Sequence, residues 1–588
     1  MLNFSGAVDR DAEQQMHETL SIDEPWGLIE AFTQWVREST TDDEKKSFDY
    51  IEDRLKTLGV SYKRFEPEMY ISLPKKATLD VLGPEQKSIR VKTPSFSAST
   101  PPEGIEAEVV YIGGAQATNV ETLFDSDIGD VDVRGKISLC EGFGMPSKIE
   151  ALEKAGAVAQ IYINPGQNIH DGMASPVWGS PGLNNREGMP GLPIVSVNNP
   201  DGCWLVEQCQ QGSVKIRVIT ELDESWKTAP VIEATIPGTE QSDKYILVHG
   251  HVDSWGIGIG DNAVGDATLL ELARVFNDHK AGLKRTLKVA WWTGHSTGRY
   301  AGSAWYVDEF AKDLDENCIA QVNIDSPGCR GATSYEDVFV MPETEAFCTQ
   351  AIQDTTGQTP GFMRPLRAGD YSFNNIGISS FYMLLSTIPA DEKQRMGLYP
   401  VGGCGGNIAW HTEDDVLDIA DKDNLINDLK VYITSLRRVL NCDMHPFDYR
   451  KTVERMHETL NQYENKAKTS GVDANFAAAH DEFKQLKQAL DNLYQQIESG
   501  QLEVSKTNTI MQQLARQLVS LDNTTAPRFY HDPALPRPSL PALLVVNDLA
   551  ELDDAEKKHA QVDLRQGINH VAGSIRQARI FLEMSANL

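Results

Sequence analysis

The sequence predicts an α/β protein with three parts: a mostly parallel sheet sandwiched by helices, an inserted β-rich domain and a C-terminal helical bundle. Strand-like and helix-like segments alternate between residues 232 and 442, which is the pattern of a parallel sheet with crossover helices. Several short strand-like runs with few helices occupy residues 105–225. Beyond Pro446, apolar residues recur at the spacing of amphipathic helices.

The N-terminal part begins with helical segments. Thr41 and Glu44 form a capping box for a helix that we expect to end at Gly59. Strand-like runs follow between residues 60 and 82, and residues 95–104 are rich in Ser, Thr and Pro. Such a stretch is typical of a domain boundary.

The later segments complete the division into domains. The insert contains strand-like runs at 107–113, 133–140 and 192–197, whereas the stripes at 476–497 and 510–521 predict bundle helices. From these patterns we predict an α/β domain at 1–104 and 226–445, an insert at 105–225 and a helical bundle at 446–588.

Composition excludes several classes of partner. The net charge of −31 over 588 residues disfavours nonspecific binding to nucleic acid or to an anionic membrane. No stretch approaches the ~20 apolar residues of a membrane span, and the N-terminus has no basic flank followed by a long apolar run. The eight cysteines are scattered without close pairs, which favours a reducing, cytoplasmic location.

Side chains that bind metals follow the predicted strands. His251 and Asp253 come directly after one apolar run, Asp325 ends another, and Asp261 opens a helix-like stretch. His411 follows much later. A lone histidine beside a strand is more often a core or surface residue, but open α/β sheets bind ligands at the carboxyl ends of their strands. Histidine with carboxylates suits zinc or similar divalent ions.

The order of these motifs resembles a known family. His251-x-Asp253, Gly260-Asp261-Asn262, Asn323-Ile324-Asp325 and His411-Thr412-x-x-Asp415 are similar to motifs of the zinc exopeptidases of the aminopeptidase, glutamate carboxypeptidase and transferrin receptor type. The resemblance implies that His251 and Asp325 bind one metal, that His411 binds a second, and that Asp261 bridges them. Asp253 would stand behind His251 as an orienting carboxylate.

The same resemblance extends to cofactor and assembly. It implies one or two divalent ions, zinc in the first place, with manganese, iron or cobalt as alternatives. The insert resembles the protease-associated domain of the larger family members, on the run Val133-Arg134-Gly135-Lys136-Ile137. The C-terminal helices, with Pro527-Arg528-Phe529-Tyr530-His531, resemble the dimerisation domain and imply a homodimer.

The sequence departs from the family pattern at the catalytic base. The family has two adjacent glutamates, of which one is the general base and the other ligates the second metal. Here His295 and Ser296 take these positions, and no Asp or Glu occurs between Arg285 and Val307. Loss of a general base removes ~10²–10⁴ in rate unless another group replaces it. His295 could replace it, because imidazole carries protons at neutral pH, or it could ligate a metal.

Four further residues are candidates for contact with substrate. Arg364 and Arg367 fall where the carboxypeptidase branch supplies arginines for substrate carboxylates, by bidentate contacts. An ordinary surface role fits these two arginines equally well. Arg299 closely follows His295 and would face the pocket. Tyr371, in the place of a histidine found in many relatives, would donate a hydrogen bond to an oxyanion.

We therefore expect a cytoplasmic, homodimeric hydrolase that depends on a divalent metal. It would cleave an amide or peptide bond in a small, carboxylate-bearing molecule or short peptide, with His295 in place of the glutamate base. Two alternatives stay open. One is a metal-dependent lyase or deaminase on the same scaffold. The other is a noncatalytic binding protein like the transferrin receptor, against which the four retained metal-type residues argue.

Overall fold

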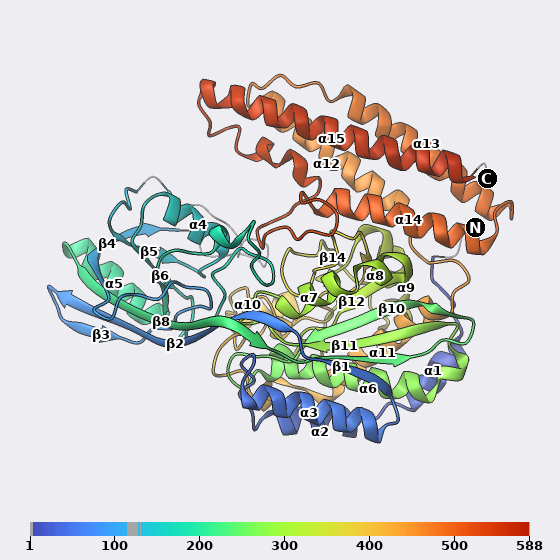
Figure 1. Cartoon of the computed structure of the whole chain (residues 1–588), viewed down its shortest axis with the longest axis horizontal. Coiled ribbons are helices and arrows are strands. Elements are labelled where there is room, and N and C mark those ends of the chain that lie inside the picture. Colours follow the sequence, from blue (N-terminus) through green and yellow to red (C-terminus); the bar gives the residue numbers. More distant parts are fainter. Residues whose placement is uncertain (1–3, 115–127, 130, 587–588) are drawn as a thin grey trace.

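The computed structural model describes residues 4–114, 128–129 and 131–586. They fold into an α/β domain, a β-rich insert to one side of it and a bundle of long helices across it (Figure 1). The predicted fold class is confirmed. Among the helices that the structure describes, none combines the length and hydropathy of a membrane span.

A six-stranded sheet, β1-β9-β11-β10-β12-β15, forms the centre of the α/β domain. Strand β10 pairs in parallel with β11 and β12, and β12 pairs in parallel with β15, whereas β9 runs antiparallel to both neighbours. The parallel strands therefore end along one edge, where such sheets bind ligands. The strands are β1 (Ser61–Phe65), β9 (Val231–Ile236), β10 (Gln241–His251), β11 (Arg285–Trp292), β12 (Cys318–Asn323) and β15 (Ser379–Ser380).

Helices cover both faces of this sheet (Figure 1). Successive side chains of β10 point to opposite faces. Ile246 and Val248 belong to the large core that includes α6, and Tyr245 and Leu247 pack with α7 and α8. The helices of the domain are α1 (Arg10–Glu18), α2 (Asp23–Phe32), α3 (Asp42–Thr57), α6 (Val264–Asp278), α7 (Ala301–Glu309), α8 (Ala311–Asn317), α9 (Glu345–Thr356), α10 (Ala390–Met396) and α11 (Lys422–Asn441).

The predicted capping box opens α3. The Thr41 hydroxyl accepts a hydrogen bond from the Glu44 amide at 3.4 Å, and the Glu44 carboxylate accepts one from the Thr40 amide at 2.5 Å. The helix ends before Gly59, whose φ of 66° places it in the left-handed region that favours glycine. A separate pair of short strands, β13 (Val338–Phe339) and β14 (Phe362–Met363), lies outside the main sheet.

The insert begins earlier in the chain than the boundary predicted at residue 104. Its seven-stranded sheet, β3-β2-β8-β4-β5-β6-β7, includes two strands that precede this position, and β2 pairs with β8 along its whole length. The Ser- and Pro-rich stretch at 95–104 is thus a loop inside the insert. The elements are β2 (Glu68–Gly83), β3 (Lys87–Ile89), β4 (Ile105–Gly113), β5 (Ile137–Glu141), α4 (Pro146–Lys154), β6 (Ala159–Ile163), β7 (Ile194–Val197), α5 (Asn199–Gln211) and β8 (Lys215–Thr228).

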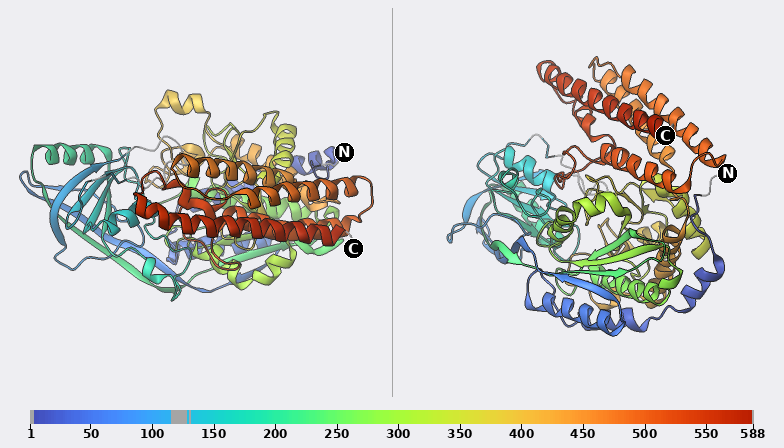
Figure 2. Two further views of the ribbon diagram at one scale, coloured as in Figure 1. Left: turned by 90° about the horizontal axis from the view of Figure 1, so that it is seen from above. Right: turned by 45° about the vertical axis from the view of Figure 1, so that its right-hand side comes forward.

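The C-terminal bundle lies along the length of the molecule (Figure 2). It begins close to the predicted residue 446, and α14 connects it to the α/β domain: Arg516 donates hydrogen bonds to the carbonyls of Leu314, Gly377 and Cys318. Its helices are α12 (Tyr449–Thr469), α13 (Ala477–Glu498), α14 (Val504–Asn523) and α15 (Asp554–Ala586).

Candidate metal centre

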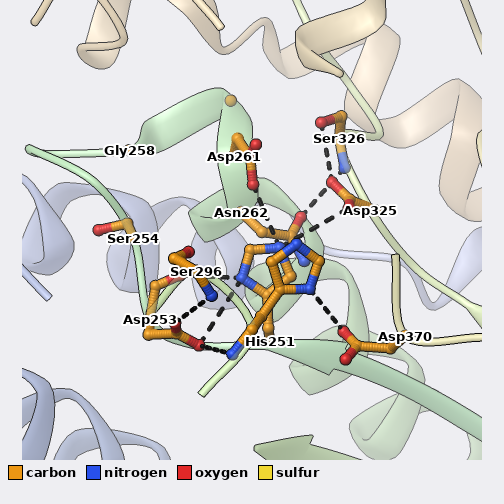
Figure 3. A network of polar contacts seen from close by, with 12 residues as sticks. His251, Asp253, Ser254, Gly258, Asp261, Asn262, Ser296, Asp325, Ser326 and Asp370 are labelled. Atoms are coloured by element: carbon orange, nitrogen blue, oxygen red, sulfur yellow. Dashed lines mark hydrogen bonds and ion pairs between the residues drawn. The ribbon is translucent and has the colours of Figure 1, made fainter. Parts of the chain in front are cut away.

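The four predicted metal ligands meet at the carboxyl edge of the central sheet (Figure 3 shows three of them). His251 ends β10, Asp325 follows β12, Asp261 lies in the turn before α6, and His411 lies in the loop before α11. His251 Nε2 is 3.1 Å from Asp261 Oδ1 and 3.6 Å from Asp325 Oδ2. His411 Nε2 is 3.1 Å from Asp261 Oδ2. Asp261 therefore stands between the two histidines.

The donor set fits a divalent cation. With bonds of ~2.0–2.2 Å, neighbouring donors on a tetrahedral zinc ion are about 3.3 Å apart, close to the separations found. The Nε2 of His251 is buried and makes no well-formed hydrogen bond within the described residues, although two carboxylates lie beside it. Burial lowers the pKa of His251, but Asp261 and Asp325 raise it well above its usual value. Their negative charge would equally attract a metal ion.

His251 is oriented by a backbone carbonyl. Its Nδ1 lies 2.8 Å from the Asp253 carbonyl oxygen, so Nδ1 carries the proton and Nε2 is free to bind a metal. The Asp253 carboxylate, expected behind His251, is 4.0 Å from Nδ1. It instead accepts hydrogen bonds from the amides of His295 and Ser296, at 3.1 and 2.7 Å, and from the Ser39 hydroxyl at 2.8 Å. Asp253 thus holds the turn that presents His295.

Two further residues position the aspartates. Asp415, the last residue of the His411 motif, accepts hydrogen bonds from the amides of Gly260 and Asp261, at 2.6 and 2.9 Å. Burial raises the pKa of Asp415 to about 7. The Ser326 hydroxyl donates to Asp325 Oδ1 at 2.9 Å. The sequence did not single out Ser326, and its only signal is that it follows Asp325.

His295 lies against His251 and is hydrogen-bonded from behind. The two rings stack with centroids 3.7 Å apart and planes at 13°. The His295 Nδ1 is 3.0 Å from Asp370 Oδ2, and Asp370 is fully buried. Burial would raise the pKa of Asp370, but the neighbouring His295 lowers it below its usual value. Donor atoms of His251, His295 and Asp325 lie within 4.8 Å of one another.

Aromatic rings surround the other histidine. Trp410 stacks on His411 at 3.5 Å between centroids, and Trp255 lies edge-on at 4.2 Å. The His411 Nδ1 is 3.0 Å from the carbonyl oxygen of Asp171, a residue of the insert. Ser296, where the family's second-metal ligand would stand, is buried and bonded to Asp253 through its amide.

A cavity of about 120 Å³ opens onto these groups. Asp261, His295, Asp325 and His411 line it on one side. The rest of its wall is largely apolar and comes from both the insert and the α/β domain. Its apolar members include Phe143, Met145 and Met173 of the insert and Trp255, Tyr300 and Met383 of the α/β domain.

Arg299 also lines the cavity and is only 6% exposed. Its Nε donates to the Ser175 carbonyl at 2.6 Å, and its Nη2 donates to the Met173 carbonyl at 3.0 Å. Within the described part of the chain, no carboxylate pairs with this guanidinium, and the neighbouring Tyr300 side chain also interacts with it. A buried cation without a counterion favours an anionic ligand.

The other two arginines bind the C-terminal region and do not reach the cavity. Arg364 Nη1 lies 2.5 Å from Asp522 Oδ2 on α14. Arg367 donates to the Asp532 carbonyl at 2.6 Å and stacks on Trp178 at 3.5 Å. The expectation that they bind substrate is corrected accordingly: a distant segment of the chain occupies both guanidinium groups.

Tyr371 is likewise turned away from the site. Its side chain is fully buried and its hydroxyl pairs with the Ser380 hydroxyl at 2.5 Å. An oxyanion in the cavity would therefore not meet this donor. The preceding residue, Asp370, faces His295 instead, because adjacent side chains in this turn point in different directions.

Comparison with known proteins finds two matching family models. Residues 231–434 match the model of peptidase family M28, and residues 105–205 match the PA domain. The predicted resemblance to the zinc exopeptidases is thus confirmed for these parts of the chain. The M28 match contains all four candidate ligands together with His295 and Asp370.

Sequence relatives of the M28 domain include carboxypeptidase Q. The orang-utan protein (Pongo abelii) is 28% identical over 242 residues, covering 38% of this chain and 48% of the relative. The human protein is 27% identical, with the same coverage. The chain thus spans about half the length of the curated relatives that it matches.

Solved structures share the fold. An M28 peptidase precursor from Shewanella amazonensis aligns with a TM-score of 0.55 and 18% identity, over 73% of this chain and 96% of that one. An aminopeptidase from Aneurinibacillus aligns with a TM-score of 0.52 and 20% identity, over 72% and 95%. At these identities the likeness concerns the fold alone.

Proposed function

We propose that this chain is a metal-dependent hydrolase of an amide or peptide bond in a small, carboxylate-bearing substrate. The observation that carries the proposal is a metal face in which His251 lies beside the carboxylates of Asp261 and Asp325. It borders a cavity that is also lined by Arg299, a buried cation without a carboxylate partner in the described residues. A divalent metal held there, zinc in the first place, would supply Lewis-acid activation of a carbonyl group and of water.

We infer that one metal ion is bound. Catalytic zinc sites use three protein ligands and keep one position open. His251, Asp325 and the Oδ1 atom of Asp261 would be these three ligands. On the other side, only Asp261 Oδ2 and His411 Nε2 face each other, flanked by aromatic rings. Two donors are too few for a tight zinc site, so His411 would act by orienting Asp261.

His295 is the proposed proton carrier. Two imidazoles bound to one tetrahedral zinc would have ring centres about 5 Å apart and diverging planes. His251 and His295 are instead stacked at 3.7 Å and nearly parallel, so both rings cannot bind one ion as they stand. The Nε2 of His295 is therefore beside the metal face, available to accept and return a proton.

Asp370 fixes this state of His295. A carboxylate accepts but does not donate when ionised, so the 3.0 Å contact places a proton on His295 Nδ1 and leaves Nε2 as the base. The lowered pKa of Asp370, opposed by burial and caused by His295, agrees with an ionised carboxylate.

Arg299 is the proposed anchor for the substrate carboxylate. No carboxylate in the described residues pairs with this guanidinium, and two carbonyls fix its Nε and Nη2, so a bound carboxylate would meet a preorganised cation. The apolar wall fits an uncharged acyl or aryl group next to the scissile bond. N-acyl amino acids and short peptides with an apolar residue combine both features.

The direct test is turnover of N-acyl amino acids and dipeptides by the metal-loaded protein. We expect hydrolysis of apolar members of the series, reduced ~10²–10⁴-fold in His295→Ala with metal content unchanged. The matched control is His570→Ala, at an exposed position on α15. Full metal loading without any hydrolysis would contradict the proposal and favour a lyase or deaminase.

We also propose a homodimer formed through the C-terminal helices. The observation in support is that α15 exposes apolar side chains, with Val562 48%, Ile580 38% and Met584 64% exposed. Light scattering after size-exclusion chromatography should give twice the monomer mass. An Ile580→Asp, Met584→Asp variant should give the monomer mass, and a dimer in that variant would exclude this surface.

For location, we propose the cytoplasm. All eight cysteines lie in the described part of the chain, and none forms a disulfide. Such usage is typical of reducing compartments. Fractionation of the source cells would test it, and recovery of the native protein outside the cytoplasm would overturn it.

A further inference from the structure

A short loop of the insert reaches both ends of the proposed site. Residues 170–175 lie between β6 and β7, and the cavity is partly lined by them. Asp171 and His411 exchange two hydrogen bonds. The Asp171 amide donates to the His411 carbonyl at 2.8 Å, and the Asp171 carbonyl faces His411 Nδ1 at 3.0 Å. The second contact places the proton on Nδ1, so Nε2 is left to face Asp261.

His411 needs such support. Its backbone has a φ of 59°, in the left-handed region that residues with a Cβ adopt only rarely. An unfavourable backbone of this kind persists where the surroundings over-determine it. The paired hydrogen bonds to Asp171 provide this restraint, and they come from a different domain.

The same loop holds Arg299. Both carbonyls that fix the guanidinium, those of Met173 and Ser175, belong to residues 170–175. A displacement of this loop would therefore move His411 and release Arg299 together. The neighbouring Tyr300 side chain also interacts with the guanidinium, but the two loop carbonyls hold its Nε and Nη2.

Lys92 fastens the loop to the segment that carries His411. Its Nζ lies 2.7 Å from Asp171 Oδ2 and 3.2 Å from Glu413 Oε2. Arg90 adds an ion pair with Glu413 at 2.8 Å. The Lys92 side chain is 22% exposed, and its backbone pairs with Ser196 of β7. Lys92 thus lies at the junction of the loop, the insert sheet and the α/β domain.

We propose that Lys92 and residues 170–175 form a clamp through which the insert sets the positions of His411 and Arg299. Lys92 is a positioning residue: it touches neither metal nor substrate, and it acts through Asp171 and Glu413. The consequence for catalysis rests on the proposed function, whereas the clamp itself does not. Docking of the insert would then control substrate affinity and the shape of the metal face together.

The first test uses hydrogen–deuterium exchange of the metal-free full chain. Lys92→Met should speed exchange in peptides covering 168–175 and 409–416 together. Lys92→Arg should restore slow exchange in both, because it keeps the charge. The control is Lys87→Met, which removes a similar ion pair (2.8 Å to Asp201) on the insert, away from the cavity. Faster exchange in only one peptide, or equal effects of Lys87→Met, would overturn the clamp.

The second test separates the clamp from the proposed activity. Lys92→Met should weaken zinc binding about 10-fold, as loss of outer support does, measured by competition with a chromophoric chelator. On any substrate identified, it should raise KM about 10-fold and change kcat less than 2-fold. Zinc affinity equal to that of the unchanged protein would overturn the coupling to the metal face. Absence of turnover in all variants would contradict the proposed function while the exchange result still decides the clamp.

Discussion

The two oxygens of Asp261 face unequal surroundings. On the Oδ1 side, His251 and Asp325 complete a group of three donors, and His295 stacks beside it. On the Oδ2 side, His411 stands alone between two indole rings. The resemblance to the family implies two metal positions, whereas we infer that this chain supplies donors for one. We infer that loss of the glutamate pair leaves the metal position beside His251 complete. His411, which would bind the second metal in the family, would here only orient Asp261.

The unequal sides also separate the roles of the insert and the central sheet. The donor-rich side is built from strand ends and from residues that follow them, such as Ser326 and the Asp253 carbonyl. The donor-poor side depends on Asp171 of the insert. We infer that the sheet fixes the metal and that the insert adjusts what surrounds it.

The largest effect is expected when a metal ligand on the Oδ1 side of Asp261 is removed. A structural zinc site contributes about 10–16 kcal/mol over four ligands, so the loss of one ligand costs about 3 kcal/mol, or ~100-fold in affinity. His251→Ala should lose that much affinity in calorimetric titration. His411→Ala should lose only ~10-fold, as expected for outer support. Equal losses would mean that both histidines ligate tightly bound ions.

The second-largest effect is expected from Arg299→Met, which removes the buried cation of the cavity. A buried hydrogen bond to a charged group contributes about 1.5–3 kcal/mol, so KM for a carboxylate substrate should rise roughly 10- to 100-fold while metal affinity stays unchanged. Arg364→Met is the matched control, because its guanidinium pairs with Asp522 on α14. It should lower thermal stability and leave KM unchanged. A KM effect confined to Arg364→Met would reverse the assignment.

Asp370→Asn should have a smaller effect, on kcat alone. The amide keeps the shape but does not enforce a proton on His295 Nδ1, and loss of such support costs roughly 10-fold or more. Zinc content and KM should be unchanged. Nitrogen NMR of labelled histidine would show the tautomer of His295 directly, and an unaltered tautomer with lowered kcat would assign Asp370 a structural role only.

Restoring the family's glutamate pair should create a second metal position on the Oδ2 side of Asp261. The double variant His295→Glu, Ser296→Glu supplies the family's pair, and we expect it to bind one more ion per chain. His295→Glu alone is the control and should stay at one. A second ion in the single variant would locate the lost site elsewhere.

Much of this centre could be predicted from the chain because its ligands follow apolar strands. The ends of parallel strands meet at one edge, so the strand order that periodicity reveals brings His251 and Asp325 together. Asp261 and His411 required the motif order of a known family. The metal-binding roles of these four residues remain predictions, but the structure places their side chains together.

Other features depend on contacts between distant segments, which local patterns do not encode. Arg364 and Arg367 stand where the family binds substrate carboxylates. Their guanidinium groups instead contact Asp522 and the Asp532 carbonyl. The sheet of the insert extends past the boundary predicted at 104, because β2 pairs with a strand about 150 residues later. Asp370 was not predicted as a site residue, since no pattern shows which of two adjacent side chains faces a site.

We propose that the Oδ1 side of Asp261 holds a metal ion and that the Oδ2 side does not. The zinc content of the unmodified protein tests this: the protein is saturated with zinc, dialysed against buffer and measured by mass spectrometry of the element. We expect one ion per chain, and none in a His251→Ala, Asp325→Asn variant treated in the same way. Two ions per chain in the unmodified protein would show that both sides bind metal.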